Sequence, residues 1–456
     1  MIPIVTPTEM AAVDAAATEP VDVLIRRAAG AVAAEAVSML GGTYGRRVVV
    51  VAGKGNNGND GRVAARLLAR DGVRAVVLDA GELPPAMPQA DLYLDAAFGT
   101  GFRGTWDPPP QPMAPVLAVD IPSGISGLTG DAAGSPWHAA RTVTFAALKP
   151  GLVQADGPGH SGEVVVADIG LDVSVASGWL VESGDVAAWV PSRAADDHKW
   201  RHAVWVVAGS AGMQGAGWLC ARSAGRADAS YVRASSPGLE HPDAPREAVG
   251  TGLPASGWGR EVADGAARFG AVVVGPGIGL ASHVRDELEA VVRSGVPVVL
   301  DADALRAVGQ EPLAATTSAG DTPTVVMTPH DGEYESLMGR EPGADRFAAA
   351  RAAAAHHGCI VLLKGPTTVV ADPGGSVYAV RSGDARLATA GSGDVLSGII
   401  GAHLAAGAQP LRGAAAAAYL HGVAGRVAGE HGVLAGDIAE VIGDARSLLA
   451  DPAAPG

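Results

Sequence analysis

The stretch RVVVVAGKGNNGNDGRVAARLLARDG, residues 47–72, decides the fold class of this 456-residue chain. It begins with a continuous valine run, which predicts a strand buried on both faces of a sheet. A glycine-rich segment follows, and then RVAARLLARDG predicts a helix. Strand, glycine turn and helix in this order are typical of a βαβ unit. Gly53, Gly55 and Gly58 also fit the G-x-G-x-x-G dinucleotide fingerprint, although an ordinary glycine-rich strand–helix turn has the same spacing.

The same alternation of short apolar runs and alanine-rich helical stretches continues along the chain, and the predicted strands fall into two series. The first series is Arg47–Ala52, Ala75–Leu78, Leu92–Leu94, Val116–Val119, Thr142–Phe145 and Val164–Ala167. The second series is Ala203–Ala208, Ala271–Val274, Pro297–Leu300, Thr324–Met327, Ile360–Leu363 and Thr368–Ala371. Apolar strands separated by helices indicate parallel sheets with both faces covered. We therefore expect two three-layer α/β domains in tandem, joined by the polar segment Val190–Lys199 and followed by a frayed tail, Asp451–Gly456.

Composition narrows the function class. Apolar residues make up 48% of the chain and charged residues 18%, which is enough apolar material for buried cores. The 33 basic and 48 acidic side chains give a net charge of −15, which argues against a nucleic-acid-binding protein. Neither a signal peptide nor a long apolar span is evident, so we expect a cytoplasmic enzyme without membrane contact. Cys220 and Cys359 predict two buried thiols rather than a disulfide framework or a zinc site.

Polar side chains follow three strands of the first series. Asn57, Asp95 and Ser123 each come just after a predicted strand, and such positions gather at one edge of a parallel sheet. Oxygen ligands without sulfur or imidazole suit a hard cation, and the small number of carboxylates favours potassium. Asp120 is a candidate general acid or base, assisted by Lys149. Helix capping or an Asx turn is the alternative for each aspartate, and a surface position is the alternative for Lys149.

The segments GKGNNGNDGRVAARLL, DAAFGTG, AVDIPSG and TFAALKPGL make residues 1–191 resemble the NAD(P)H-hydrate epimerase domain. The resemblance implies a Rossmann-like fold and a potassium ion held by Asn57, Asp95 and Ser123. It also implies that the hydrated nicotinamide cofactor contacts three regions. These are Asn56, Asn57, Gly58, Asn59 and Asp60; Gly99, Thr100, Gly101, Phe102, Arg103, Gly104 and Thr105; and Asp120. Two residues depart from the family pattern: Asn59 stands where glycine is usual, and Arg26 where an acid is usual.

The second half carries a candidate phosphoryl-transfer site. Gly391, Ser392 and Gly393 precede an apolar helix, so their backbone N–H groups can form an anion-binding turn at its N-terminus. Asp394 lies in the first turn, where a carboxylate can accept a proton from an attacking hydroxyl. A plain capping role is the alternative. The histidines lack the spacing and cysteine partners of a metal site.

The segments VVVGPGIG, DADAL, VMTPHDGEYESL, LLKGPTTVVA and ATAGSGDVLSGIIGA make about His198–Gly432 resemble the ADP-dependent NAD(P)H-hydrate dehydratase, a member of the ribokinase-like superfamily. We expect the corresponding domain to span residues 198–450. The resemblance implies that the hydrate contacts Ala216, Gly277, His330 and Asp394. It implies that the adenine nucleotide contacts Lys364, Gly365, Pro366, Thr367, Thr368 and Gly393. One departure is Gly217, where a second alanine is usual, and it is expected to loosen one wall of the substrate site.

Together the two resemblances imply an enzyme that repairs hydrated nicotinamide cofactors. The first half is expected to interconvert the R and S hydrates of NADH and NADPH, with Asp120 as the catalytic residue. The second half is expected to dehydrate the S form with ADP as co-substrate, Asp394 as the catalytic residue and magnesium accompanying the nucleotide. A homo-oligomer is expected. The alternatives are a vitamin or sugar kinase fused to a nicotinamide-dependent oxidoreductase, and a ligand-binding or scaffold module in the first half.

Overall fold

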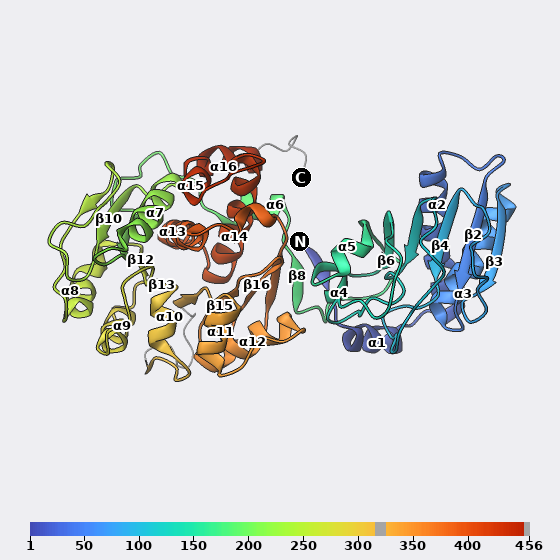
Figure 1. Cartoon of the computed structure of the whole chain (residues 1–456), viewed down its shortest axis with the longest axis horizontal. Helices are drawn as coiled ribbons and strands as arrows, with labels where there is room; N and C mark the ends of the chain where they lie inside the picture. The colour runs from blue at the N-terminus through green and yellow to red at the C-terminus, as the bar shows by residue number, and fades with distance from the viewer. Residues whose placement is uncertain (315–324, 451–456) are drawn as a thin grey trace. The chain divides into compact units, whose positions relative to one another are not determined.

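The computed structural model describes residues 1–314 and 325–450. The chain divides into two compact units, Ile2–Trp179 and Leu180–Gly456, with Met1 grouped with the second unit. Each unit is built on its own mainly parallel sheet, as the two series of apolar runs predict (Figure 1). The tail Asp451–Gly456 and the first residue of the predicted strand Thr324–Met327 lie outside the described residues. No helix among the described residues is long and apolar enough to cross a membrane.

The first unit contains a six-stranded parallel sheet in the order β3-β2-β4-β5-β6-β7. Its elements are β1 (Ile2–Ile4), α1 (Pro7–Ala16), α2 (Val21–Leu40), β2 (Arg47–Ala52), α3 (Asn56–Arg70), β3 (Arg74–Asp79), β4 (Leu92–Ala96), β5 (Val116–Val119), β6 (Arg141–Phe145), α4 (Pro150–Val153), α5 (Gly157–Ser161) and β7 (Glu163–Ala167). Valines alternate between the two faces of β2, so Val48 and Val50 pack under α2 and α3 while Val49 and Val51 pack on the other face. Both faces of this sheet are therefore buried.

Helix α3 begins earlier than the sequence predicts. Asn56 to Gly61, expected to form a loop, are the first turns of the helix. The reason is close packing: a Cβ at Gly58 would lie 2.0 Å from the carbonyl oxygen of Gly53, and one at Gly61 would lie 2.5 Å from the Cβ of Ala96. Only glycine lets the helix start this near the end of β2. Asn57 and Asp60 consequently project from a rigid helical turn rather than from a flexible loop.

The second unit contains a larger sheet whose strands run β17-β16-β15-β14-β13-β12-β9-β10-β11. The seven strands from β15 to β11 are parallel, and β16 and β17 are antiparallel. The strands are β9 (Ala203–Val207), β10 (Tyr231–Ser235), β11 (Val249–Gly250), β12 (Ala271–Val274), β13 (Val298–Leu300), β14 (Val325–Met327), β15 (Ile360–Leu363), β16 (Thr368–Ala371) and β17 (Val377–Val380). Strands β10, β11 and β17 were not predicted from the sequence, and neither were β1 and the short β8 (Gly178–Leu180).

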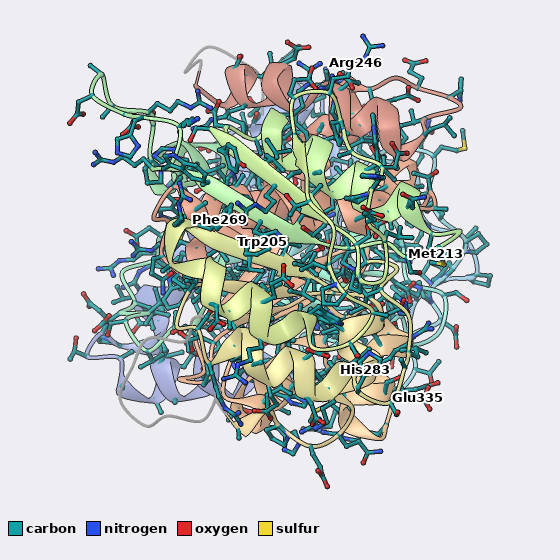
Figure 2. The ribbon with its side chains drawn as sticks, turned by 90° about the vertical axis from the view of Figure 1, so that its left-hand side faces the viewer. Trp205, Met213, Arg246, Phe269, His283 and Glu335 are labelled. Atoms are coloured by element: carbon teal, nitrogen blue, oxygen red, sulfur yellow. The ribbon has the colours of Figure 1, made fainter. Side chains whose placement is uncertain are left out.

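Two sets of helices cover the second sheet, one on each side (Figure 1). One set is α7 (Gln214–Arg226), α13 (Ser392–Ala405), α14 (Pro410–Val427), α15 (Ala435–Glu440) and α16 (Ile442–Ala450), with α6 (Ser183–Trp189) packed on α14 and α16. The other set is α8 (Trp258–Gly265), α9 (Val284–Val292), α10 (Asp303–Val308), α11 (Asp331–Met338) and α12 (Arg346–His357). Cys220 and Cys359 are free and buried, as expected. Trp205 on β9 packs against Phe269, with ring centroids 5.1 Å apart (Figure 2).

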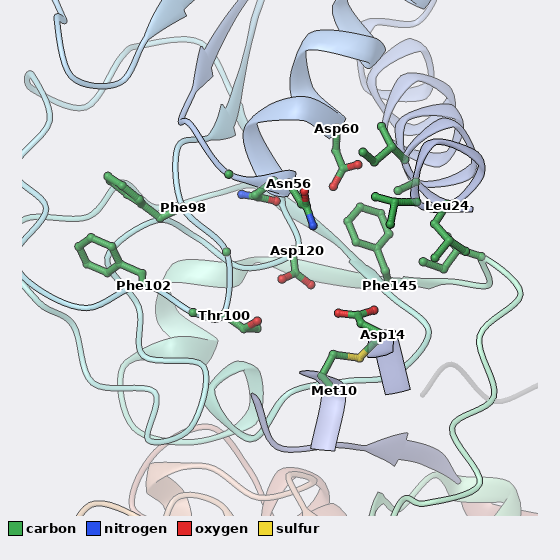
Figure 3. Close-up of a pocket in the computed structure, with 18 of the residues that line it drawn as sticks. Met10, Asp14, Leu24, Asn56, Asp60, Phe98, Thr100, Phe102, Asp120 and Phe145 are labelled. Atoms are coloured by element: carbon green, nitrogen blue, oxygen red, sulfur yellow. The ribbon is translucent and has the colours of Figure 1, made fainter. Parts of the chain in front are cut away.

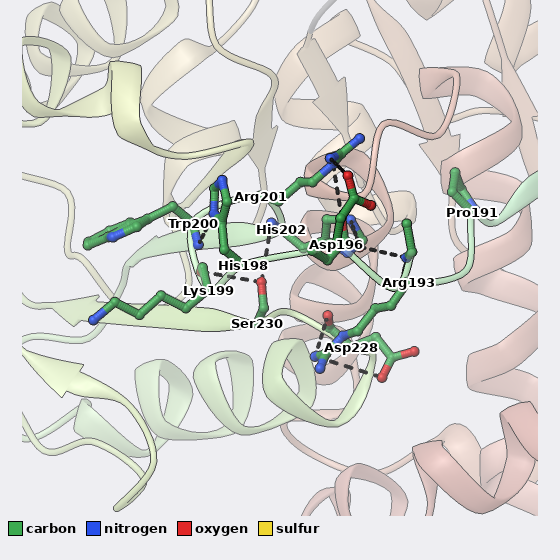
Figure 4. Close-up of polar contacts among 12 residues, drawn as sticks. Pro191, Arg193, Asp196, His198, Lys199, Trp200, Arg201, His202, Asp228 and Ser230 are labelled. Carbon is green, nitrogen blue, oxygen red and sulfur yellow. Dashed lines mark hydrogen bonds and ion pairs between the residues drawn. The ribbon is translucent and has the colours of Figure 1, made fainter.

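The segment expected to join the domains is attached to the second unit (Figure 4). Arg193 donates a hydrogen bond to the carbonyl oxygen of Asp228 at 3.0 Å, and the backbone N–H of His202 donates to Ser230 Oγ at 3.2 Å. The side chain of His202 also lies 3.4 Å from Asp197. The division between the units, after Trp179, thus precedes the predicted joint at Val190–Lys199.

Candidate active sites

A pocket of about 530 Å³ lies at the carboxyl ends of the strands of the first sheet (Figure 3). Its lining comes from the first turns of α3, the turn after β4, the residue after β5 and helices α1 and α2. The predicted substrate residues that line it are Asn56, Asn57, Asp60, Gly99, Thr100, Gly101, Phe102 and Asp120. Gly58 packs instead against Gly53, and Asn59 lines a neighbouring groove. Within the described residues, Arg103, Gly104 and Thr105 are not part of the pocket lining.

Asp95 and Ser123 are in direct contact, as their predicted strand-end positions require. The Ser123 hydroxyl donates to Asp95 Oδ1 at 2.5 Å, and the Ser123 backbone N–H donates to Oδ2 at 2.8 Å. Asp95 is fully buried, and burial raises the pKa of its carboxyl although the hydrogen bonds from Ser123 oppose the increase. Asn57 lies beside the same turn, and both polar atoms of its buried amide have no hydrogen-bond partner. The arrangement presents a buried carboxylate, a hydroxyl and an unsatisfied amide in one region.

Asp120 and Lys149 form a buried pair. Lys149 Nζ donates to Asp120 Oδ1 at 2.7 Å and to Thr144 Oγ1 at 2.8 Å, and the lysine is only 1% exposed. A surface position for Lys149 is therefore wrong. Asp120 has a φ of 68°, a left-handed conformation that is unusual for a non-glycine residue. This strained backbone directs the carboxylate into the pocket, where Figure 3 shows it opposite Asp14 and below Asp60.

Two further carboxyl groups share this pocket. Asp60 is 7% exposed, and burial raises its pKa to about 8, with the charges of Asp120 and Asp14 adding to the increase. Burial also raises the pKa of Asp14, against the opposing effect of Lys149. Asp14 reaches the pocket from α1 and was not expected from the sequence. The pocket thus holds a protonated acid, Asp60, near a lysine-paired carboxylate, Asp120, which is a suitable arrangement for proton transfer.

In the second unit, a half-buried lysine joins groups at the carboxyl ends of β13, β14 and β15. Lys364 Nζ lies 3.0 Å from Asp301 Oδ1 and 3.3 Å from Glu333 Oε2, and these two carboxylates raise the pKa of the lysine against the effect of burial. Ser397 on α13 donates to Asp301 Oδ2 at 2.7 Å. Asp301 was not predicted as a site residue. The sequence feature that could have identified Asp301 is the one that identifies Asp95: a carboxylate at the end of a buried strand.

Asp394 lies beside this cluster at the start of α13. The helix begins at Gly391, whose φ of 87° allows the sharp turn into the helix. A Cβ at Gly393 would lie 3.5 Å from Lys364 Nζ and 3.8 Å from Asp301 Oδ2. Burial raises the pKa of Asp394 to about 7, and the charge of Asp301 contributes further. The carboxyl group is thus poised to take up a proton near neutral pH.

Of the four predicted hydrate-binding residues, Ala216 and Gly277 lie close together. A Cβ at Gly277 would lie 3.4 Å from the Cβ of Ala216 and 3.2 Å from that of Met213, a residue labelled in Figure 2. At Gly217, an added Cβ would lie 2.9 Å from the carbonyl oxygen of Ala208, so α7 lies unusually close to β9 there. His330 caps α11, where its Nδ1 accepts a hydrogen bond from the Gly332 N–H at 3.1 Å.

Hydrogen bonds to neighbouring segments fix the predicted nucleotide loop, Lys364 to Thr368. The Lys364 N–H donates to the carbonyl oxygen of Pro329 at 2.8 Å, and Arg346 donates to the Lys364 carbonyl oxygen at 2.6 Å. Arg346 also pairs with Asp331 at 2.9 Å. A Cβ at Gly365 would lie 2.8 Å from the guanidinium group of Arg346. Gly365 and Pro366 form the turn, Thr367 is buried, and Thr368 begins β16, so the loop is short and rigid.

Both halves of the chain match known protein families. Residues 204–445 match the family NAD(P)H-hydrate dehydratase, and residues 21–85 and 79–151 match the family YjeF-related protein N-terminus. The bifunctional NAD(P)H-hydrate repair enzyme Nnr of Mycobacterium tuberculosis is 38% identical over 425 residues, with 86% of each chain covered. The protein of the same name from Moorella thermoacetica is 34% identical, with 87% of each chain covered.

Solved structures resemble the second unit. An ADP/ATP-dependent NAD(P)H-hydrate dehydratase from Bacillus subtilis, co-crystallized with ATP/Mg²⁺, covers 59% of this chain and 97% of its own, with 25% identity and a TM-score of 0.50. A ribokinase-like superfamily protein from Enterococcus faecalis covers 60% of this chain and 98% of its own, with 21% identity and a TM-score of 0.51, which shows a ribokinase-like fold. Since the two family matches fall in the two units that carry the two sets of polar side chains, and since relatives match both together, the chain belongs to the family of bifunctional NAD(P)H-hydrate repair enzymes.

Proposed function

We propose that the first unit interconverts the R and S hydrates of NADH and NADPH, and that the second unit dehydrates the S hydrate at the expense of ADP. The products are the intact reduced cofactor, AMP and phosphate. The observation that carries the proposal is that each unit holds its own carboxyl group near a lysine that is largely shielded from solvent: Asp120 with Lys149, and Asp394 near Lys364. The relatives named for both activities match both units of the chain.

In the first unit, Asp120 is the catalytic residue. Lys149 keeps the carboxylate in place and stabilises its charge. The lone pair of the ring nitrogen expels the hydroxyl group, which leaves as water with the proton of Asp60, and the ring becomes an iminium ion. Asp120 then takes a proton from the water that adds to the opposite face of the ring, which inverts the carbon. Asp60, protonated because of its raised pKa, donates a hydrogen bond to the leaving or returning oxygen. Two parts of the lining enclose the hydrated nicotinamide ring. These are the turn formed by Gly99–Phe102 and the side chain of Asn56. Contacts with the more distant parts of the substrate stay a prediction for Arg103, Gly104 and Thr105.

We infer that the donor set for potassium lies next to this pocket, with Asn57 in the pocket lining and Asp95 and Ser123 buried outside it. Asn57, Asp95 and Ser123 would hold the ion, and the unsatisfied amide of Asn57 is the observation that supports this. A buried carboxylate with neutral oxygens around it suits a monovalent hard cation better than zinc. The bound ion would supply positive charge near the hydrated ring and fix the strand-end turns.

In the second unit, Asp394 is the catalytic residue. It accepts the proton of the hydrate hydroxyl as that oxygen attacks the terminal phosphorus of ADP, and AMP leaves. The N–H groups of the Gly391–Gly393 turn hold the transferring phosphoryl group, and the Lys364–Thr368 loop holds the nucleotide. Phosphate then leaves the substrate more readily than hydroxide would, and loss of a ring proton restores the double bond. Magnesium would accompany the nucleotide and neutralise its phosphates. Ala216, Gly277 and His330 contact the hydrate.

The test is incubation of the protein with a mixture of the R and S hydrates, with and without ADP, and chromatography of each epimer. We expect enzymatic exchange of the epimers without ADP, and complete recovery of the reduced cofactor with ADP, with AMP and phosphate formed in equal amounts. Spontaneous exchange of the epimers, measured without protein, is subtracted. Recovery that stops when the S form is consumed would contradict the epimerase assignment. Recovery without consumption of ADP would contradict the dehydratase assignment.

A further inference from the structure

A second groove, of about 670 Å³, lies between helices α2 and α3 of the first unit. The residues that line it are Asp22, Ile25, Arg26, Asn59, Arg62, Val63, Arg66, Leu67 and Arg70. Four of the nine are arginines and one is an acid, so the groove has a formal charge of 4 − 1 = +3 in a chain whose net charge is −15. This concentration of positive charge is opposite to the charge of the chain as a whole.

The arginines form a row with an apolar floor. Arg62, Arg66 and Arg70 are four residues apart on α3 and therefore lie on one face of the helix. From the first to the third the row extends about 12 Å along the helix axis, at 1.5 Å per residue. Arg66 and Arg70 are exposed, while the neighbouring apolar residues Val63 and Leu67 are half-buried. The row is long enough to contact more than one phosphate group.

The charge of these arginines is only partly neutralised within the protein. Arg62 donates to the carbonyl oxygen of Gly53 at 2.6 Å and lies 4.0 Å from Asp79. Arg70 lies 3.6 Å from its neighbour Asp71, and both side chains are at least half exposed. For Arg66, the structure of the described residues records no ion pair. Exposed ion pairs of this kind are weak, so the guanidinium groups of Arg66 and Arg70 stay available for an anion.

The groove adjoins the active-site pocket at the first turn of α3. Ile25 lines both the pocket and the groove, and Asn59 lines the groove while its neighbour Asp60 lines the pocket. Arg26 and Asn59 lie on the same surface, next to the row of arginines.

We propose that this groove binds the phosphate-bearing arm of the dinucleotide hydrate, and that Arg66 and Arg70 at its far end bind the 2′-phosphate of NADPH hydrate. The proposal rests on the proposed epimerase function of the adjoining pocket, which would hold the hydrated ring. A phosphate monoester carries close to two negative charges at neutral pH, and the planar guanidinium group of arginine donates two parallel hydrogen bonds to phosphate oxygens. The first unit would therefore prefer NADPH hydrate over NADH hydrate.

The test compares an Arg66→Gln/Arg70→Gln variant of the whole chain with the unchanged protein. Epimerisation of the R hydrates of NADPH and NADH is measured without ADP, so that the second unit does not turn over. We expect KM for NADPH hydrate to rise about tenfold, as for loss of charge-assisted hydrogen bonds worth roughly 1.5 kcal/mol, with kcat unchanged. KM for NADH hydrate should change little. Adenosine 2′,5′-bisphosphate should inhibit the unchanged protein and lose its effect on the variant.

The matched control is Arg46→Gln/Arg74→Gln, which removes the same charge from exposed positions of the first unit outside the groove. It should leave both KM values unchanged. Equal increases in KM for both hydrates in the Arg66/Arg70 variant would overturn the assignment of the 2′-phosphate, and unchanged values would overturn the groove as a substrate site. If the unchanged protein does not exchange the epimers at all, the proposed epimerase function fails. In that case, the groove can still be tested by calorimetry. Binding of adenosine 2′,5′-bisphosphate is measured on protein that is already saturated with ADP. Equal affinity of the variant and the unchanged protein would overturn the proposal that the groove binds phosphate.

Discussion

The two units place a carboxyl group and a lysine at the ends of parallel strands, but they pair them differently. In the first unit, Lys149 contacts Asp120 itself. In the second unit, Lys364 is paired with Asp301 and Glu333, and Asp394 lies beside a cation whose charge is already compensated. As a result, burial and neighbouring carboxylates raise the pKa of Asp394 to about 7. The comparison teaches that burial, together with carboxylates that compensate the charge of the neighbouring lysine, gives the second unit an aspartate that can take up a proton near neutral pH.

The largest expected effect is on the second unit. Asp394→Asn keeps the shape of the side chain but removes the proton acceptor, so ADP-dependent dehydration of the S hydrate should fall by about 10²–10⁴-fold. Binding of ADP, measured by calorimetry, should change little, and epimer exchange should be unaffected. Asp286→Asn, at an exposed position on α9, is the matched control and should retain full activity. Near-normal turnover of the Asp394 variant would show that Asp394 is not the catalytic base.

The corresponding change in the first unit sharpens the comparison. Asp120→Asn should abolish enzymatic exchange of the R and S hydrates, by about 10²–10³-fold, because the lysine-paired base is lost. Dehydration of pure S hydrate should remain normal, since the second unit has its own catalytic group. Asp71→Asn, at the exposed end of α3, serves as the control. If the Asp120 variant stays folded but loses both activities, the units are coupled and do not act independently.

A smaller effect is expected in the pH profile of the second unit. Asp394 must be ionised to accept a proton, so kcat for dehydration should fall about tenfold per pH unit below its pKa of about 7. Asp301→Asn removes the neighbouring charge that contributes most and frees Lys364, so the acidic limb should move to lower pH. Asp303→Asn removes a charge that raises the pKa of Asp394 less, so it should shift the acidic limb less. An acidic limb that does not move in the Asp301 variant would show that Asp394 is not the group that titrates.

The smallest effect concerns stability. The pKa of Asp60 is raised in the folded protein, so the folded state holds a proton that the unfolded state releases near pH 4. The unfolded state is therefore increasingly favoured as the pH rises from about 4 to 8, because over this range only the unfolded state releases the Asp60 proton. Asp60→Asn should become more stable relative to the unchanged protein across this range, by on the order of a few kcal/mol at pH 8. Hydrogen exchange of the α3 amides measures the difference. A difference independent of pH would contradict the raised pKa.

Strand positions and strand-end residues could be predicted because they leave local patterns. The valine runs mark β2 and β12, and the contact of Asp95 with Ser123 follows from the parallel register of β4 and β5. Asp301 could have been found in the same way, since it follows a buried strand directly. The ribokinase-like fold of the second unit, implied by its motifs, is confirmed by the solved structures.

Other features leave no local pattern. Asp14 comes from α1, far in sequence from Asp60 and Asp120, and only tertiary packing brings these carboxyl groups into one pocket. The burial of Lys149 depends on Thr144 and Asp120, which lie on different segments. The early start of α3 contradicts the turn preference of its asparagines and glycines, because close contact with Gly53 outweighs local propensity. The division after Trp179 was not foreseen because the polar segment that follows is held by hydrogen bonds to the second unit.

The burial of Lys149 and the enclosure of Lys364 have a practical consequence for chemical labelling. The chain has four lysines, and the other two, Lys54 and Lys199, are exposed, one in each unit. An amine-reactive dye should therefore acylate Lys54 and Lys199 and spare the two lysines of the active sites. Because Lys54 lines the pocket of the first unit while Lys199 stacks near Trp200, a dye on Lys54 would report occupation of that pocket, and one on Lys199 would serve as an internal reference.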